Sequence, residues 1–125
     1  MSLTSPLSAP APTEIRLGKD KTTLTVVFAE KTYTFTAEFL RVLSPSAEVQ
    51  GHGVGQQKTI SGKKDVTITG LEPVGHYALK IVFSDGHASG IYTWHYFADM
   101  GEKQRDEWQA YTDRLRAAGL KREAA

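Results

Sequence analysis

The stretch YALKIVFSDGHASGIY, residues 77–92, decides the fold. Aromatic and aliphatic residues recur at every second position of its first half: Tyr77, Leu79, Ile81 and Phe83. This period of two is typical of a strand that buries one face. Asp85-Gly86 then supplies residues that tolerate the positive φ angles of a tight turn, and the chain returns through Ile91 and Tyr92. We therefore expect an antiparallel hairpin here.

An earlier hairpin shows the same alternation and begins at Thr23. Its apolar face comprises Leu24, Val26 and Phe28, followed across Glu30-Lys31 by Tyr33 and Phe35. Thr36 can cap a short helix after this hairpin, because its hydroxyl can accept from a free backbone N–H. The apolar stripe of that helix is Phe39, Leu40 and Leu43. Ser44-Pro45 ends the helix, since the residue before proline avoids helical angles.

The remaining elements complete an α+β fold. Val66 and Ile68 predict a short strand, and Gly70–Gly75 predicts a proline-containing turn. From residue 102 to 118 the apolar residues recur at helical spacing, at Trp108, Tyr111 and Leu115. Gly119 ends this amphipathic helix. We expect a mainly antiparallel β-sheet, with a short helix after the first hairpin and the amphipathic helix near the C-terminus.

A chain of 125 residues has room for one hydrophobic core, so we expect one domain. Residues 1–13 contain mainly small polar residues and proline, and we predict a disordered tail there. Residues 14–101 form the domain, residues 102–119 form the helix packed on it, and residues 120–125 are a second tail.

The composition excludes several classes of protein. Fifteen Lys and Arg oppose fourteen Asp and Glu, so the formal charge of +1 gives no basic footprint for nucleic acid or an anionic membrane. The chain has no signal-peptide pattern and no apolar run of roughly 20 residues, and we therefore expect a cytoplasmic protein. It has no cysteine, so a metal here would need histidine, carboxylate or carbonyl ligands.

The catalytic motifs that we considered are missing. None of His52, His76, His87 and His95 begins the His-x-Asp or His-x-Glu pattern of a non-haem iron oxygenase. The glycines of 51–55 do not have the spacing of a phosphate-binding or dinucleotide loop. We therefore expect no enzyme activity in the chain alone. The aromatic cluster of Tyr92, Trp94, Tyr96 and Phe97 has no basic groove beside it, so we expect it to pack in the core at the end of a strand rather than to stack on nucleic-acid bases.

Several sequence blocks resemble one family. They are LRVLSPSAEV at 40–49, GHG at 51–53, EPVGHYA at 72–78 and FSDGHASGIYTW at 83–94. Together they are similar to the stand-alone bacterial members of the gamma-butyrobetaine hydroxylase-like N-terminal family, over about residues 15–100. In the hydroxylases the resembling domain holds a structural zinc through three cysteines and one histidine. Here the stretch 43–49 contains no cysteine, and His87 matches the histidine ligand. A similar domain is attached to a scaffold protein of iron–sulfur cluster assembly, which implies an accessory role near metal-cofactor biogenesis.

We therefore predict a non-enzymatic accessory domain that binds another protein through Ser44–Gly55 and Asp85–Tyr92. The residues of this predicted surface are Arg41, Ser44, Ser46, Glu48, His52, Asp85, His87 and Tyr92. A first alternative is a protein that binds iron or zinc through His52 and His87, with Asp85 or Glu48 as an added oxygen ligand. A second alternative is a small enzyme that uses Asp85, His87 or Arg41 in acid–base or anion-binding roles.

Overall fold

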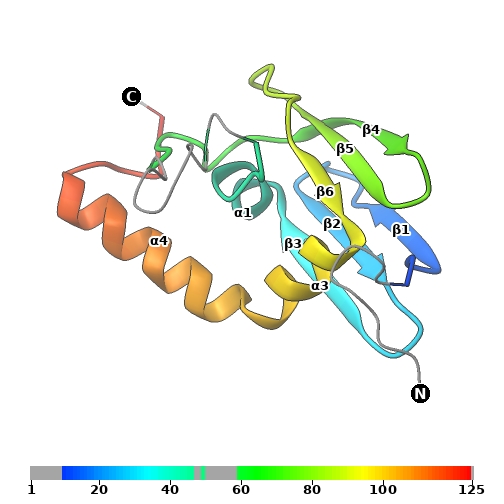
Figure 1. Cartoon of the computed structure of the whole chain (residues 1–125). Helices are drawn as coiled ribbons and strands as arrows, with labels where there is room; N and C mark the ends of the chain where they lie inside the picture. Colours follow the sequence, from blue (N-terminus) through cyan, green and yellow to red (C-terminus); the bar gives the residue numbers. More distant parts are fainter. Residues whose placement is uncertain (1–9, 47–48, 50–58, 125) are drawn as a thin grey trace.

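The computed structural model describes residues 10–46, 49 and 59–124. In this part of the chain two three-stranded antiparallel sheets are joined to helices, of which the C-terminal one is the longest (Figure 1). One sheet contains β1 (Glu14–Leu17), β2 (Thr23–Val27) and β3 (Thr32–Thr36), and the other contains β4 (Ile68–Val74), β5 (Ala78–Phe83) and β6 (Ile91–Thr93). The helices are α1 (Ala37–Val42), α3 (Trp94–Glu102) and α4 (Gln104–Ala118). The predicted α+β class is confirmed.

The first hairpin has the predicted inward face. Leu24 lies opposite Phe35, and Val26 lies opposite Tyr33. Leu24, Val26 and Phe35 are fully buried because the alternation directs them to one side of the sheet. Strand β1, which the pattern of residues 14–17 does not predict, pairs antiparallel with β2 and is largely exposed.

The second hairpin pairs β5 with β6, with Leu79 opposite Tyr92. Gly86 adopts a φ of +91° in the connection, as the predicted turn requires. The predicted turn over Gly70–Gly75 is wrong, because β4 continues to Val74 and only Gly75 has the positive φ of a turn residue. Pro73 is tolerated in β4 because that strand pairs with β5 alone and lies at the sheet edge.

Helix α1 begins where the sequence predicts it. The hydroxyl of Thr36 accepts a hydrogen bond from the Phe39 N–H at 3.0 Å, which satisfies one of the free donors of the first turn. Helix α4 also ends as predicted, at Gly119 with a φ of +69°.

The stretch after β6 differs from the prediction. We expected its aromatic residues at the end of a strand, but Thr93 caps α3 by accepting from the Tyr96 N–H at 3.0 Å. The expectation that the aromatic residues pack inward is met by Phe97, which is fully buried. Gly101 lies against the ring of Tyr33, where a Cβ would overlap the ring, so glycine permits α3 to approach β3.

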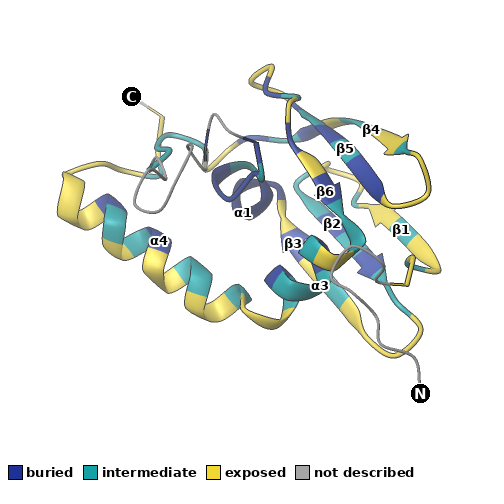
Figure 2. Ribbon diagram, viewed as in Figure 1, coloured by how far each residue is buried: buried dark blue, intermediate teal, exposed yellow. Residues whose placement is uncertain are grey.

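Buried side chains from both sheets and from α1, α3 and α4 form one core (Figure 2). Its largest fully buried members are Tyr92, Tyr111, Phe35, Phe83 and Phe97. Tyr111 and Leu115 attach α4 to this core, whereas Trp108 is half-buried. Over the described residues we find no helix whose length and apolar character would let it cross a membrane.

The predicted boundaries of the tails and the domain stay predictions. Residues 1–9 of the predicted N-terminal tail lie outside the described residues.

Candidate functional site

Three segments that are distant in the sequence bring charged side chains together around Asp85. The Nε of Arg41, on α1, donates to Asp85 Oδ2 at 2.7 Å. The Nζ of Lys63, in the segment before β4, lies 2.6 Å from the same oxygen. The backbone N–H of His87 donates to Asp85 Oδ1 at 3.0 Å. We call Arg41, Ser44, Lys63, Asp85 and His87 the Arg41 cluster.

A second set of hydrogen bonds fixes the inner side of the cluster. His87 Nε2 and Ser44 Oγ are 3.0 Å apart, and both side chains are buried. The hydroxyl of Tyr92 donates to the carbonyl of Leu40 at 2.5 Å, so β6 holds the end of α1. A side chain at Gly90 would overlap the Ser44 hydroxyl, so glycine is required for this close approach.

The electrostatics of the cluster favour an ionised Asp85. Burial opposes this ionisation, but hydrogen bonds from Lys63 and the His87 N–H, together with the charge of Arg41, outweigh it and hold the pKa of Asp85 well below its usual range. Such a carboxylate takes up a proton only in strong acid. Asp85 is therefore poorly matched to acid–base chemistry near neutral pH.

One polar atom in the cluster and one beside it have no hydrogen-bond partner among the described residues. Arg41 Nη1 is buried there without a hydrogen-bond partner, and so is Ser46 Oγ. About a tenth of the Arg41 side chain is exposed. Buried donors are rarely left unpaired in folded proteins, so Arg41 is a candidate binding group.

The structure brings together most of the predicted site. Hydrogen bonds link Arg41 to Asp85, Asp85 to the His87 N–H, and the His87 ring to Ser44. Ser46 adjoins them, because its N–H donates to Ser44 Oγ at 3.4 Å. Tyr92 is fully buried, and its hydroxyl donates to the Leu40 carbonyl. Its place in the predicted binding surface stays a prediction.

Other residues of the predicted site are not placed, and one member of the cluster was missed. Glu48 and His52 lie outside the described residues. No sequence pattern singles out Lys63, because the adjacent lysines at 63 and 64 are ordinary in a glycine-rich loop. What distinguishes Lys63 is its contact with the carboxylate of Asp85, which lies in a distant turn, and this contact is visible only in the structure.

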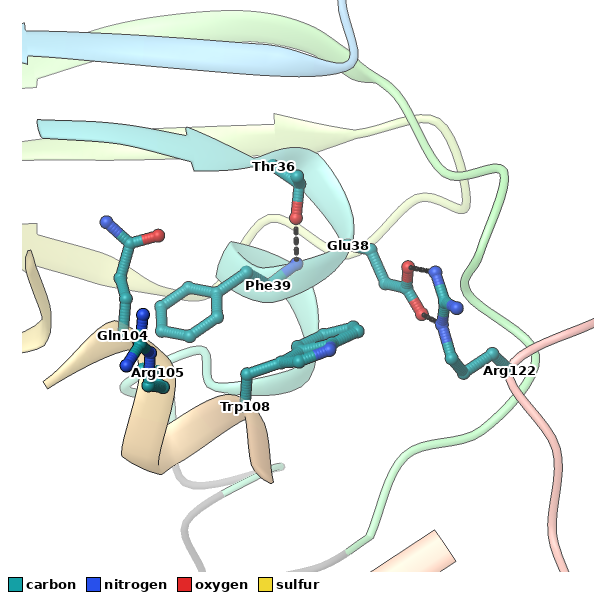
Figure 3. Close-up of a pocket in the computed structure, with 7 residues that line it drawn as sticks. All are labelled: Thr36, Glu38, Phe39, Gln104, Arg105, Trp108 and Arg122. Atoms are coloured by element: carbon teal, nitrogen blue, oxygen red, sulfur yellow. Dashed lines mark hydrogen bonds and ion pairs between the residues drawn. The ribbon is translucent and has the colours of Figure 1, made fainter. Parts of the chain in front are cut away.

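A groove between α1 and α4 is a second site (Figure 3). It has a volume of about 370 Å³, and its lining residues are Thr36, Glu38, Phe39, Gln104, Arg105, Trp108 and Arg122. At one end, Arg122 donates from Nε and Nη2 to the two oxygens of Glu38, both at 2.8 Å. Figure 3 shows Phe39 and Trp108 between this ion pair and the side chains of Gln104 and Arg105.

Comparison with known proteins identifies the family. The family model described as gamma-butyrobetaine hydroxylase-like, N-terminal, matches residues 15–98. The chain belongs to this family. The predicted resemblance is therefore confirmed, and the matched range contains the whole Arg41 cluster.

Three solved structures are similar to this chain. Two proteins with NMR solution structures are 44% and 40% identical to this chain, with TM-scores of 0.80 and 0.81. The first match covers 92% of this chain and 91% of the other, and the second covers 98% and 92%. A crystal structure of a DUF971-family protein of unknown function from Acidithiobacillus ferrooxidans is 36% identical, with a TM-score of 0.60 over 72% of this chain and 91% of the other. A search of curated proteins found no match.

The zinc that the family resemblance implies does not fit the residues of this chain. The sequence has no cysteine, so three of the four ligands are missing. Ser44 stands beside His87, and a neutral hydroxyl is a poor substitute for a thiolate ligand. The carboxylate of Asp85 is already held by two cations. Over the part of the chain that the structure describes, no three histidine or carboxylate side chains converge as metal ligands do.

Proposed function

We propose that this domain is a non-enzymatic accessory module that binds another protein, and that the Arg41 cluster receives an acidic side chain of that protein. Arg41 Nη1 is the observation that carries this proposal, because it is a buried donor without an acceptor among the described residues. A carboxylate matches a guanidinium in shape and charge, so it would supply the acceptor.

The charge of the cluster points to the same ligand. Arg41 and Lys63 both pair with Asp85, so two cations face one anion. All three side chains are partly exposed, by 11%, 23% and 20%. Partial burial also strengthens an ion pair relative to one in bulk water.

A titration with a short oligoglutamate peptide, followed by two-dimensional NMR, tests the proposal. We expect saturable shifts at residues 41, 63 and 85–87 that weaken with added salt. Arg41→Gln should abolish them, while the control Arg16→Gln, at an exposed arginine on β1, should leave them unchanged. Equal shifts in Arg41→Gln would contradict the proposal.

Within this proposal the partner belongs to metal or iron–sulfur cofactor assembly. The support is the family resemblance, since a similar domain is attached to a scaffold protein of that machinery. Titration of such a scaffold onto the wild type, Arg41→Gln and Arg16→Gln provides the direct measurement. Binding that is lost only in Arg41→Gln is the expected result.

Metal binding through His52 and His87 is the second candidate function. The favouring observation is that His87 is buried beside Ser44, at the position that matches the family's histidine ligand. Metal analysis of protein purified without a histidine tag or chelator decides between the candidates. Near-stoichiometric iron or zinc that is lost in a folded His87→Ala variant would favour this candidate, and an unchanged metal content in the variant would exclude it.

A further inference from the structure

The α1–α4 groove ends in two groups that are suited to a guanidinium. Glu38 offers both carboxylate oxygens, which accept parallel hydrogen bonds from Arg122 at 2.8 Å each. Trp108 offers the face of its ring, and Arg122 Cζ lies 5.2 Å from the ring centroid. A planar guanidinium satisfies both groups at once, whereas an ammonium can match only a point charge.

Glu38 depends on this arginine. Its side chain is 6% exposed, and Arg122 is its ion-pair partner within the described residues. A buried carboxylate without a cation is strongly unfavourable, so the position requires a positive group. The hydrogen bonds raise the pKa of Arg122.

The other attachments of the segment that carries Arg122 lie at the surface or in its backbone. Two backbone hydrogen bonds join it to the segment before β4, from Gly62 N–H to Lys121 O at 2.9 Å and from Lys64 N–H to Arg122 O at 3.0 Å. Glu123 pairs with Lys64 at 3.7 Å, and both side chains are about half exposed. The Leu120 N–H donates to the Leu115 carbonyl at 2.9 Å. The side chains on either side of Arg122 are exposed, including Leu120 at 40%. Segments with few buried contacts open more readily than the core.

The groove beside the ion pair has space for the residues that would flank an incoming arginine. Phe39 and Trp108 provide an apolar wall, with their ring centroids 6.4 Å apart. Arg105 lies at the other end of the groove, exposed and without an ion pair among the described residues. The site is therefore complementary to an arginine with an acidic residue close to it in the sequence.

We propose that Glu38 and Trp108 form an arginine-recognition site, which Arg122 fills in the isolated chain and which an arginine side chain of a partner protein fills when residues 119–124 are released. This site is separate from the Arg41 cluster, and neither proposal depends on the other.

NMR titration with N-acetyl-arginine amide tests the site. Arg122→Ala vacates it, and we expect this variant to bind the probe about tenfold more tightly than the wild type, because the internal competitor is gone. The shifts should centre on the Trp108 indole N–H and the Glu38 amide. The corresponding citrulline amide, which is neutral and of similar shape, should not bind.

A second variant removes the charge of Glu38, which accepts the guanidinium, in addition to the internal competitor Arg122. Adding Glu38→Gln to Arg122→Ala should abolish binding of the arginine probe while leaving the oligoglutamate shifts at Arg41 intact. If Arg122→Ala does not fold, Arg122→Lys provides the comparison, with probe binding tighter than in the wild type. Equal binding by the wild type and the Arg122 variants, or binding that survives Glu38→Gln, would overturn the proposal. Concentration-dependent dimerisation of Arg122→Ala without probe binding would also overturn it and would make a second copy the occupant.

Discussion

Asp85 connects the Arg41 cluster at the scale of a single residue. One of its oxygens faces Arg41 and Lys63, and the other accepts the N–H of His87. The same carboxylate thus neutralises charge and shapes the turn. The substitution Asp85→Asn separates these two roles, because asparagine keeps an oxygen acceptor but carries no charge.

Asp85→Asn should lower stability in a pH-dependent manner. The folded pKa of Asp85 lies below the unfolded value of about 3.9, so its stabilising effect is complete above about pH 5 and is lost as the pH falls toward the folded pKa. We expect the variant to be less stable by about 1 kcal/mol near neutral pH, with partial exposure limiting the effect. Urea unfolding at several pH values measures the difference.

Asp65→Asn serves as the control for that series, because Asp65 is exposed. Its stability difference from the wild type should be small at every pH. A difference for Asp85→Asn that stays constant down to about pH 3 would show that charge is not the cause.

The residues of the cluster were only partly predictable. Arg41, Ser44, Asp85 and His87 were found because they stand in sequence blocks that resemble a family. Lys63 was not predicted. Whether a lysine pairs with a carboxylate or faces solvent depends on which distant segments the fold brings beside it. The pairing with Asp85 joins residues on different segments, and no local spacing encodes it.

At the scale of elements, side chains from the second hairpin and α3 hold the end of α1. Tyr92 donates to the Leu40 carbonyl and Tyr96 donates to the Leu43 carbonyl. The last carbonyls of a helix have no partner within it, so these hydroxyls satisfy groups that would otherwise need water. They also fix Ser44 and Arg41 relative to the loop that carries Asp85.

The two threonine caps should contribute separately to stability. Thr36→Ala removes the cap of α1 and Thr93→Ala removes the cap of α3, and each should cost about 1 kcal/mol in free energy of unfolding. Thr36→Ser and Thr93→Ser keep the hydroxyl and should retain most of the stability. Chemical denaturation of the four variants measures this, and equal losses for serine and alanine would argue against capping.

The predicted secondary structure is wrong where two sequence patterns point to different elements. Gly70 and Pro73 favour a turn, yet both lie in β4, where a sheet edge tolerates a residue without an N–H. Trp94, Phe97 and Met100 recur at helical spacing, and Thr93 can cap a helix, but the dense aromatic residues after a strand favoured a continued strand end. The hairpins and α4 were predictable because their periodicity is long and regular.

At the scale of the whole molecule, the segment before β4 connects the two candidate sites. Lys63 points to Asp85, while its neighbours Gly62 and Lys64 hold the backbone of residues 121–122. Consecutive residues, 62–64, therefore contact both Asp85 of the Arg41 cluster and the segment that carries Arg122. The pairing of Glu38 with Arg122 spans 84 positions, and no sequence pattern could have predicted it.

The tyrosines should make the fold sensitive to alkali. Burial raises the pKa of Tyr33 and of Tyr111 to about 12, and it raises the pKa of Tyr92 and Tyr96 further. A raised folded pKa means that stability is complete below the unfolded value of about 10 and is lost as the pH rises above it. We expect near-ultraviolet absorbance to show fewer tyrosinates in the native protein than in urea at the same alkaline pH.

Tyr77→Phe provides the control for the alkaline titration, because Tyr77 is 50% exposed and makes no side-chain hydrogen bond within the described part of the chain. The delayed ionisation should persist in this variant. Coincident titration curves for the native and urea-unfolded protein would instead mean that the buried hydroxyls are accessible.

The two tryptophans lie in separate environments. Trp94 Nε1 donates to the carbonyl of His76 at 2.8 Å, next to the β4–β5 turn, while the ring of Trp108 lies under the guanidinium of Arg122. The chain therefore carries two intrinsic fluorophores, one for each region. With Trp94 replaced by phenylalanine, the remaining emission would report the departure of Arg122 directly, so the release of this segment can be timed optically without attaching a dye.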